Sequence, residues 1–312
     1  MKNLLLTSLL LISALTSVAI QAAEDGWIGG NCTNGSGVYQ WTNGDRYEGR
    51  CLNGAFQGQG TLTLRSGERY VGQFSNDQKH GRGIYLFSNG DRYEGQFRNG
   101  EQHGQGTLTR ANDERYVGQY QNSKKSGRGT YYYSNGDRYE GNWRDELSDG
   151  QGVYYFSNGD RYEGQWRAGL QTQGNFYWAN GNRYDGQFNS KQRHGQGTFY
   201  WANDDRYVGQ WRNSRQHGEG TQYWANGDRY EGQWQDDKMS GSGIFFYANG
   251  DKYDGGFLDD QLHGQGTYYL PNSERYVGSW IRGRREGSGQ FIDARGRVRE
   301  MEYKDDQRLY QR

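Results

Sequence analysis

One unit of 23 residues, repeated along nearly the whole chain, constrains the fold more than any other feature of this sequence. The tripeptide Tyr-x-Gly starts at eleven positions from Tyr47 to Tyr276, and successive starts lie 23 residues apart, except that Tyr162 and Tyr184 lie 22 apart. A truncated copy precedes the first unit and a decayed copy follows the last. A chain of this kind forms a quasi-linear array in which each unit packs on its neighbours, and it leaves no room for a separate catalytic domain.

Each unit contains two segments with the alternation of a β-strand. Tyr116, Gly118 and Tyr120 fall on one face of the first segment, and the second segment, 127–133, alternates two glycines and two tyrosines in the same way. Alternation over five to seven residues, bounded by Asn-Gly, is typical of a β-hairpin. The sequence therefore predicts an all-β fold: an elongated antiparallel β-hairpin repeat array, with one 23-residue hairpin per repeat.

The register of the hairpins follows from the same spacing. Pairing Phe97 with Gly104 places Gly95 opposite Gly106, so that rings and glycines share one face of the sheet. A three-residue loop containing Gly90 in a left-handed conformation keeps the next strand on that face. We expect each ring to lie flat over the bare backbone of a neighbouring glycine, which explains why glycines stand inside strands.

The amino-acid composition supports an ordered, all-β chain. Apolar residues make up only 32% of the chain and the mean hydropathy is −1.20, yet 12 Phe, 27 Tyr and 10 Trp supply aromatic rings that a disordered chain would lack. The 51 glycines and single proline favour turns and close-packed strands over helical bundles or nucleotide-binding α/β folds. Because 37 basic residues balance 37 acidic ones, nucleic acid is not an expected partner.

The first residues have the pattern of a secretory signal peptide. Lys2 is followed by an apolar run from Leu4 to Ile20, and Ala22 or Ala23 offers a small-residue cleavage site. An uncleaved membrane anchor is the alternative, but the run is short and lacks a basic flank. We expect an exported protein, periplasmic or secreted.

The repeat unit resembles a known sequence motif. Tyr-Glu-Gly-Gln-Trp/Phe, followed by Asn-Gly and His-Gly-x-Gly-Thr, resembles the MORN repeat ("membrane occupation and recognition nexus") over residues 27–303. The resemblance implies a hairpin array that serves as a scaffold or interaction module, sometimes as a dimer, and phospholipid binding has been associated with the family. The chain departs from the motif at Cys51, Gln57 and Glu286.

These observations predict four segments. They are a signal peptide at 1–22, an N-terminal partial repeat or cap at 23–46, eleven MORN-type repeats at 47–298, and a C-terminal cap or tail at 299–312. The unit at 162–183 lacks one residue and has Thr172 in place of a glycine, so we expect a local bend there.

No constellation of residues indicates catalysis. The histidines all stand ten residues after a repeat tyrosine, and equivalent positions lie two strands apart, about 9.5 Å, too far to share a zinc ion easily. We interpret them as turn residues and expect no metal, no cofactor and no catalytic residue. These histidines are His80, His103, His194, His217 and His263.

Charged residues also recur with the repeat. Asp91, Arg92 and Glu94 have counterparts in most units, which predicts ladders of ion pairs on the outer face of the sheet. A row of arginines could instead hold anionic lipid head groups, but each has an acidic neighbour.

Seven tryptophans gather in the central repeats, and by parity all of them lie on the glycine face. They form either a stacking platform for a glycan or peptide, or larger fillers of the ring layer. This candidate binding groove consists of Trp143, Trp166, Trp178, Trp201, Trp211, Trp224 and Trp234.

Cys32 and Cys51 are the only cysteines, and an even pair in an exported protein favours a disulfide. Alignment of the repeats places them at equivalent positions, about 9.5 Å apart in a regular sheet, beyond bridging reach. A bridge therefore requires the first, shortened unit to depart from the regular ladder, and we predict that it does.

Together these features predict a non-catalytic, exported scaffold that mediates protein–protein interaction or self-association, with a homodimer as one form. The alternative is an envelope-associated protein that binds phospholipid or cell-wall glycan.

Overall fold

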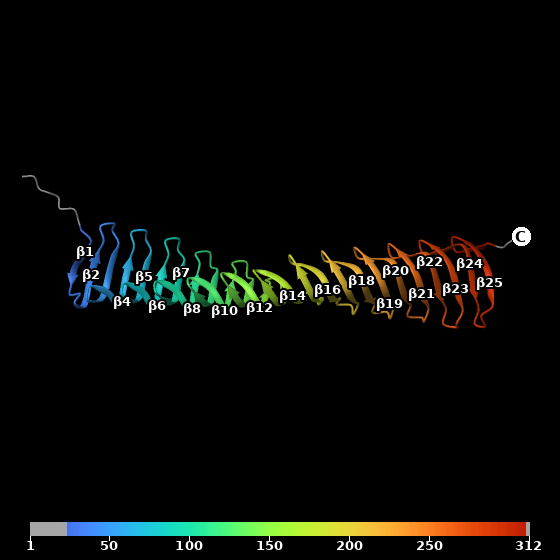
Figure 1. The fold of residues 1–312 in the computed structure, drawn as a ribbon, viewed down its shortest axis with the longest axis horizontal. Coiled ribbons are helices and arrows are strands. Elements are labelled where there is room, and N and C mark those ends of the chain that lie inside the picture. The colour runs from blue at the N-terminus through green and yellow to red at the C-terminus, as the bar shows by residue number, and fades with distance from the viewer. Residues whose placement is uncertain (1–23, 310–312) are drawn as a thin grey trace, which may run out of the picture.

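A computed structural model describes residues 24–309, and it shows a single antiparallel sheet of 26 strands drawn out into a long ribbon (Figure 1). Each strand pairs with the next along the chain, and residues 24–309 contain no helix. The predicted all-β hairpin array is confirmed. The expected signal peptide, 1–22, lies outside the described residues. No helix in the described part of the chain is long and apolar enough to cross a membrane.

Within a regular repeat the first strand has seven residues and the second has nine. The strands are β1 (Gly26–Gly30), β2 (Asn34–Gln40), β3 (Arg46–Leu52), β4 (Ala55–Thr63), β5 (Arg69–Ser75), β6 (Gln78–Leu86), β7 (Arg92–Arg98), β8 (Glu101–Thr109), β9 (Arg115–Gln121), β10 (Lys124–Tyr132), β11 (Arg138–Arg144), β12 (Leu147–Tyr155), β13 (Arg161–Arg167), β14 (Leu170–Tyr177), β15 (Arg183–Asn189), β16 (Gln192–Tyr200), β17 (Arg206–Arg212), β18 (Arg215–Tyr223), β19 (Arg229–Gln235), β20 (Lys238–Phe246), β21 (Lys252–Leu258), β22 (Gln261–Tyr269), β23 (Arg275–Ile281), β24 (Arg284–Ile292), β25 (Val298–Lys304) and β26 (Gln307–Leu309).

Two kinds of loop alternate along the two edges of the ribbon. Within a repeat the loop has two residues: Asn99 and Gly100 both have positive φ (52° and 85°), as a hairpin turn that follows the twist of the strands requires. Between repeats the loop has three residues, because Phe87 donates its main-chain N–H to the carbonyl of Asp91 at 2.9 Å, and Gly90 between them has φ 90°. The predicted three-residue loop is confirmed.

The predicted register holds over most of the hairpin and is wrong at one point. Gly95 stands opposite Gly106 as expected, but Phe97 stands opposite Gln102 and not Gly104. The second strand contains a bulge that the spacing did not reveal. Because this bulge adds an even number of residues, rings and glycines still share one face.

The glycine and the glutamine of the repeat motif make the bulge possible. Gly104 has φ 62°, a conformation that favours glycine. The side-chain Oε1 of Gln96 accepts the main-chain N–H of Gln105 at 2.9 Å, which satisfies a donor that the bulge removes from the ladder.

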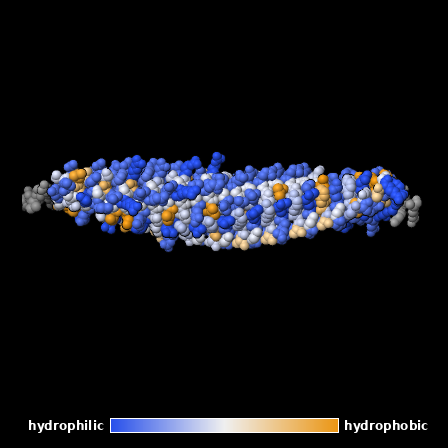
Figure 2. All heavy atoms as spheres, turned by 90° about the horizontal axis from the view of Figure 1, so that it is seen from below, coloured by the Kyte–Doolittle hydropathy of each residue, from blue (hydrophilic) through white to orange (hydrophobic). Residues whose placement is uncertain are grey.

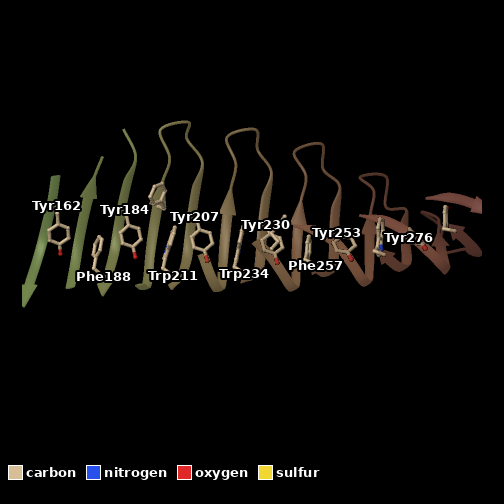
Figure 3. Close-up of a cluster of buried hydrophobic side chains, with 14 residues drawn as sticks. Tyr162, Tyr184, Phe188, Tyr207, Trp211, Tyr230, Trp234, Tyr253, Phe257 and Tyr276 are labelled. Atoms are coloured by element: carbon tan, nitrogen blue, oxygen red, sulfur yellow. The ribbon is translucent and has the colours of Figure 1, made fainter. Parts of the chain in front are cut away.

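The core is a row of aromatic rings that we call the inner ring ladder: the repeat tyrosines and, in every repeat but the first, the aromatic residue four positions later (Figure 3). Tyr93 has 0% exposure, and a Cβ added at Gly106 would lie 2.5 Å from its ring. The same ring makes edge-to-face contacts with Phe97 at 5.2 Å and with Tyr120 of the next repeat at 5.1 Å. Such contacts continue from Tyr47 to Tyr303, so the ladder joins every repeat to the next.

The short repeat differs in its bulge. Gln165 pairs with Gln173 and Trp166 with Gln171, so that Thr172 is the single extra residue in place of two. The hydroxyl of Thr172 donates to the carbonyl of Gln165 at 3.3 Å. In Figure 1 the long axis of the ribbon passes β12 and β14 without a sharp kink, so the expected local bend is not seen and the shorter bulge absorbs the missing residue.

The two terminal strands are poor templates for further pairing. β1 contains a register shift between Trp27 and Gly29, and β26, which pairs with the predicted C-terminal cap strand β25, has three residues within the described part of the chain. Irregular or short edge strands oppose the addition of another chain.

Candidate binding face

The face that carries the inner ring ladder also carries a second row of rings near the three-residue loops. Centroids of successive rings lie 4.4–5.7 Å apart, except across a gap between Trp201 and Trp224, and most of these side chains are half-buried. We call this row the outer ring ladder; it consists of Tyr131, Tyr133, Tyr154, Phe156, Phe176, Trp178, Phe199, Trp201, Trp224, Phe245, Tyr247 and Tyr268.

The structure divides the seven candidate tryptophans between the two ladders. Trp143, Trp211 and Trp234 are buried and Trp166 is half-buried, and all four belong to the inner ladder. Their indole N–H groups donate to glycine carbonyls of the sheet at 3.1–3.3 Å. These four side chains therefore pack the core.

Trp178, Trp201 and Trp224 are different, because they stand in the outer ring ladder and are only half-buried. Each occupies the same position in its repeat, immediately after the second strand. Together with the half-buried Trp166, they are the candidate tryptophans that a ligand can reach.

Two depressions lie on this face. The larger, about 660 Å³, is lined by Tyr133, Trp166 and the nearly buried Lys125. The Lys125 ammonium lies 4.7 Å from the centroid of Tyr131 and 3.4 Å from a Glu146 carboxylate oxygen. Burial lowers the pKa of Lys125, while the charge of Glu146 opposes that shift. The second depression, about 480 Å³, lies between Trp201 and Trp224.

The opposite face carries the charged rows. Arg92 pairs with Glu94 at 2.6 Å, as the sequence predicts. The guanidinium of Arg138 also lies 4.2 Å from the ring centroid of Tyr155, a stacking that recurs along the array. Arg138 is thus both paired with a glutamate and stacked on a ring, whereas Arg206 is stacked but has a valine at the glutamate position.

The aspartate of the charged motif has another role than the predicted ion pair. Asp91 Oδ1 accepts the main-chain N–H of Ala111 in the next loop at 3.0 Å, so it ties adjacent repeats together and does not pair with Arg92. The prediction was wrong because the three-residue loop turns the carboxylate along the edge of the sheet.

Asp137 is the most buried carboxylate of this kind. Burial raises its pKa, but hydrogen bonds from the Tyr154 hydroxyl (2.7 Å), the Ser157 N–H (2.8 Å) and the Asn135 amide outweigh it and hold the pKa below its usual value. The ionised carboxylate of Asp137 thus links its loop to the next repeat through Tyr154 and Ser157.

The histidines lie inside the second strand of each hairpin, just before the bulge, and not in a turn as expected; His103, for example, pairs with Gln96. Among residues 24–309, no group of three or more His, Cys, Asp or Glu side chains could hold a metal ion.

The cysteines are joined in a disulfide, with their Cα atoms 5.0 Å apart. Cys51 lies in β3, whereas Cys32 lies in the loop between β1 and β2, so the two positions are not equivalent. The carbonyl of Cys32 accepts the N–H of Gly54 at 2.8 Å and holds this loop against the first tight turn. The shortened first unit departs from the regular ladder, and this departure brings the two sulfurs within reach.

Sequence reasoning missed the outer ring ladder as a feature separate from the inner one. The signal was present, because positions 133, 156, 178, 201, 224 and 247 all hold an aromatic residue at the repeat spacing. The tyrosines and phenylalanines of this row were not predicted as part of the site, because only tryptophans were considered as candidates.

The comparisons with known proteins agree with the repeat pattern. The MORN repeat model matches residues 33–46 and then eleven consecutive units from 47–69 to 276–296. A search of curated proteins finds no match for the chain.

Among solved structures, the chain is similar to the TCP10 domain of Danio rerio CPAP in complex with a peptide of Danio rerio STIL, with 11% identity over 79% of this chain and 96% of that one and a TM-score of 0.37. It is also similar to the SAS-4 (dCPAP) TCP domain of Drosophila melanogaster in complex with a proline-rich motif of Ana2, with 11% identity over 59% of this chain and 99% of that one and a TM-score of 0.34. The assignment rests on the repeat match, which spans most of the sequence. The chain belongs to the MORN repeat family.

Proposed function

We propose that this MORN protein is an exported, non-catalytic scaffold that binds another protein, or a second copy of itself, along the outer ring ladder. The observation that carries the proposal is that row of half-buried rings, which runs from β10 to β22 with no second layer over it in the described part of the chain. Half-buried aromatic side chains are rigid and lose little entropy on binding, and they are enriched at protein interfaces.

The chemistry of the face supports binding rather than turnover. The tyrosines with strongly raised pKa values owe them to burial in the ring layers. They recur in every repeat, whereas an acid–base pair needs two groups whose environments differ.

Protein is a better partner than anionic phospholipid. Several of the arginines that could hold head groups are paired with glutamates, as at Arg92 and Glu94, and several are stacked on aromatic rings, as at Arg138. In Figure 2 the surface is mostly hydrophilic with small separate apolar patches, and no continuous apolar band is available on that side for insertion into a bilayer.

Export is supported by the pattern of residues 1–22 and by the disulfide between Cys32 and Cys51, since disulfides persist in oxidising compartments.

Single alanine substitutions test the binding surface. Trp178→Ala, Trp201→Ala and Trp224→Ala should each weaken partner binding by roughly threefold to tenfold, and the triple variant should abolish it. Val208→Ala, on the opposite face, is the matched control and should have no effect. A single substitution that abolishes binding while the fold is unchanged would contradict a distributed surface. Sedimentation equilibrium of the mature chain separates self-association, which depends on its concentration, from binding to a different protein in the native envelope.

A further inference from the structure

The outer ring ladder is broken at one point between Tyr131 and Tyr268. Trp201 is the last ring before the break and Trp224 is the first ring after it. Gln222 lies between them, at the position where an aromatic ring would contact both. Every other copy of this position in residues 24–309 holds an aromatic ring or leucine. These residues are Tyr39, Leu62, Tyr85, Leu108, Tyr131, Tyr154, Phe176, Phe199, Phe245, Tyr268 and Phe291.

A depression of about 480 Å³ occupies the break, and we call it the Gln222 pocket. Trp201 and Trp224 line it from the two neighbouring repeats, and the buried indoles of Trp211 and Trp234 line it from the inner ladder. Two half-buried indoles one repeat apart, on either side of a missing ring, leave a space for a flat group.

The pocket holds two buried amides. Gln216 is 6% exposed and Gln222 is 4% exposed. Gln216 Nε2 donates to Gln222 Oε1 at 3.1 Å, and Gln222 Nε2 donates to the carbonyl of Tyr223 at 3.2 Å. Within residues 24–309, Gln216 Oε1 accepts no hydrogen bond. Gln216 Oε1 is not one of the fully buried unpaired atoms, so it keeps contact with the open pocket, where a ligand hydroxyl can donate to it.

The charges around the pocket favour a ligand with many donors and no negative charge. Asp205, Asp237 and Asp260 line it. Asp237 and Asp260 each use Oδ1 to accept a main-chain N–H of the strand facing them, at 2.8 Å. The one cation in the lining, Arg193, donates to the carbonyl of Ser214 at 2.6 Å and stacks over Trp211. The lining therefore has three carboxylates and one guanidinium, whose Nε is buried without a partner, and its net charge is negative.

We propose that the Gln222 pocket binds a neutral sugar ring, as one residue of a glycan chain. A pyranose has two faces of C–H groups that pack against the electron-rich faces of indoles, and its edge carries hydroxyls that donate to the amide of Gln216 and to the carboxylates. A phenylalanine side chain would fill the gap but leave Gln216 Oε1 unpaired. A phosphate or carboxylate group would meet three carboxylates. This inference is independent of the proposed protein partner.

Calorimetric titration of the mature chain tests the proposal with glucose, galactose, N-acetylglucosamine and the β-1,4-linked trimer of N-acetylglucosamine. At least one of these sugars should bind with one-to-one stoichiometry. Gln222→Phe restores the ring that most other repeats contain, so the array should remain folded while affinity falls roughly tenfold or more. Gln216→Leu, which removes the acceptor Oε1, should also weaken binding. Gln171→Leu is the matched control, because Gln171 holds the same position in an earlier repeat, is equally buried, and lies outside the pocket.

Two results would overturn the proposal: no binding by any of the four sugars, or equal affinity for the wild type and Gln222→Phe. A lysine-rich peptide that binds at Gln222 in place of every sugar would also overturn it, and would assign the carboxylates to a cationic ligand. Trp178→Ala separates this proposal from the protein interface, because Trp178 is not part of the pocket lining and its loss should weaken protein binding while leaving sugar affinity unchanged.

Discussion

The hydroxyl of Tyr93 donates a hydrogen bond to the main-chain carbonyl of Gln96, 3.0 Å away and three residues further along the same strand. To reach it, the phenol crosses over Gly95, and its ring covers Gly106 on the paired strand. The bond anchors the ring beside the bulge. It recurs at 2.6–3.1 Å in ten repeats, from Tyr47, Tyr70, Tyr93, Tyr116, Tyr139, Tyr162, Tyr184, Tyr207, Tyr230 and Tyr253.

Removing one such hydroxyl should cost stability. Tyr207→Phe loses the bond to the carbonyl of Gln210 (3.1 Å) and should lower the free energy of unfolding by about 1 kcal/mol. Tyr276 is the natural control, because its buried hydroxyl has no partner within residues 24–309. Tyr276→Phe should therefore be close to neutral. Urea unfolding of both variants measures the difference, and equal losses would show that the hydroxyl bond is not what stabilises the tyrosine.

A methyl group under a ring should be far more damaging than one elsewhere in the sheet. In Gly220→Ala the new Cβ would overlap the phenol of Tyr207, and overpacking of this kind costs about 3 kcal/mol. Gly29→Ala is the control, since nothing lies within 4 Å of a Cβ at Gly29 and its φ is not positive. Thermal unfolding should separate the two variants clearly. A tolerated Gly220→Ala would mean that the rings do not lie on the glycines.

The array should lose stability at high pH. Burial, with a smaller contribution from the charge of Asp77, raises the pKa of Tyr47 to about 12, and burial raises the pKa of Tyr93 in the same direction. Tyrosines of the unfolded chain ionise near pH 10, so their contribution to stability is complete below about pH 10 and is lost as pH rises through the folded pKa. Phenolate absorbance should therefore appear together with unfolding. Smooth ionisation near pH 10 without unfolding would exclude buried tyrosines.

Loss of the disulfide should affect only the N-terminal end. In a linear array each repeat contacts its neighbours alone, so the Cys32→Ser, Cys51→Ser double variant should loosen β1 and β2 and leave distant hairpins intact. Hydrogen exchange should show faster exchange over residues 26–52 and unchanged protection beyond about residue 100. Faster exchange throughout the chain would contradict a repeat-by-repeat architecture.

The repeat spacing was sufficient to predict the hairpins, the shared face of rings and glycines, and the three-residue loop. These features follow from the two-residue period of a strand, which leaves few registers that keep Tyr93, Gly95 and Gly106 on one face. The bulge at Gly104 could not be found this way, because inserting two residues preserves the faces and therefore leaves no trace in the alternation.

The candidate site was predicted less completely. The two-residue period of a strand predicts that all seven tryptophans lie on one face. It does not tell whether a side chain lies in the middle of that face or near the loops at its edge. Trp211 is therefore core, while Trp201 is a reachable surface residue. The Gln222 pocket exists because one repeat has a polar residue where the others have a ring or leucine. The sequence shows this substitution, but only the structure shows that the neighbouring rings contact one another and that the substitution leaves a gap between them.

The central claim is that one face of the array packs and binds through its rings while the other is a solvated layer of ion pairs. A photo-cross-linking residue placed at Trp178 or at Val208, in the full chain in its native cells, tests this claim most directly. The two positions lie on opposite faces of the same region. We predict a discrete adduct from position 178 and none from position 208; adducts from position 208 alone would contradict the account.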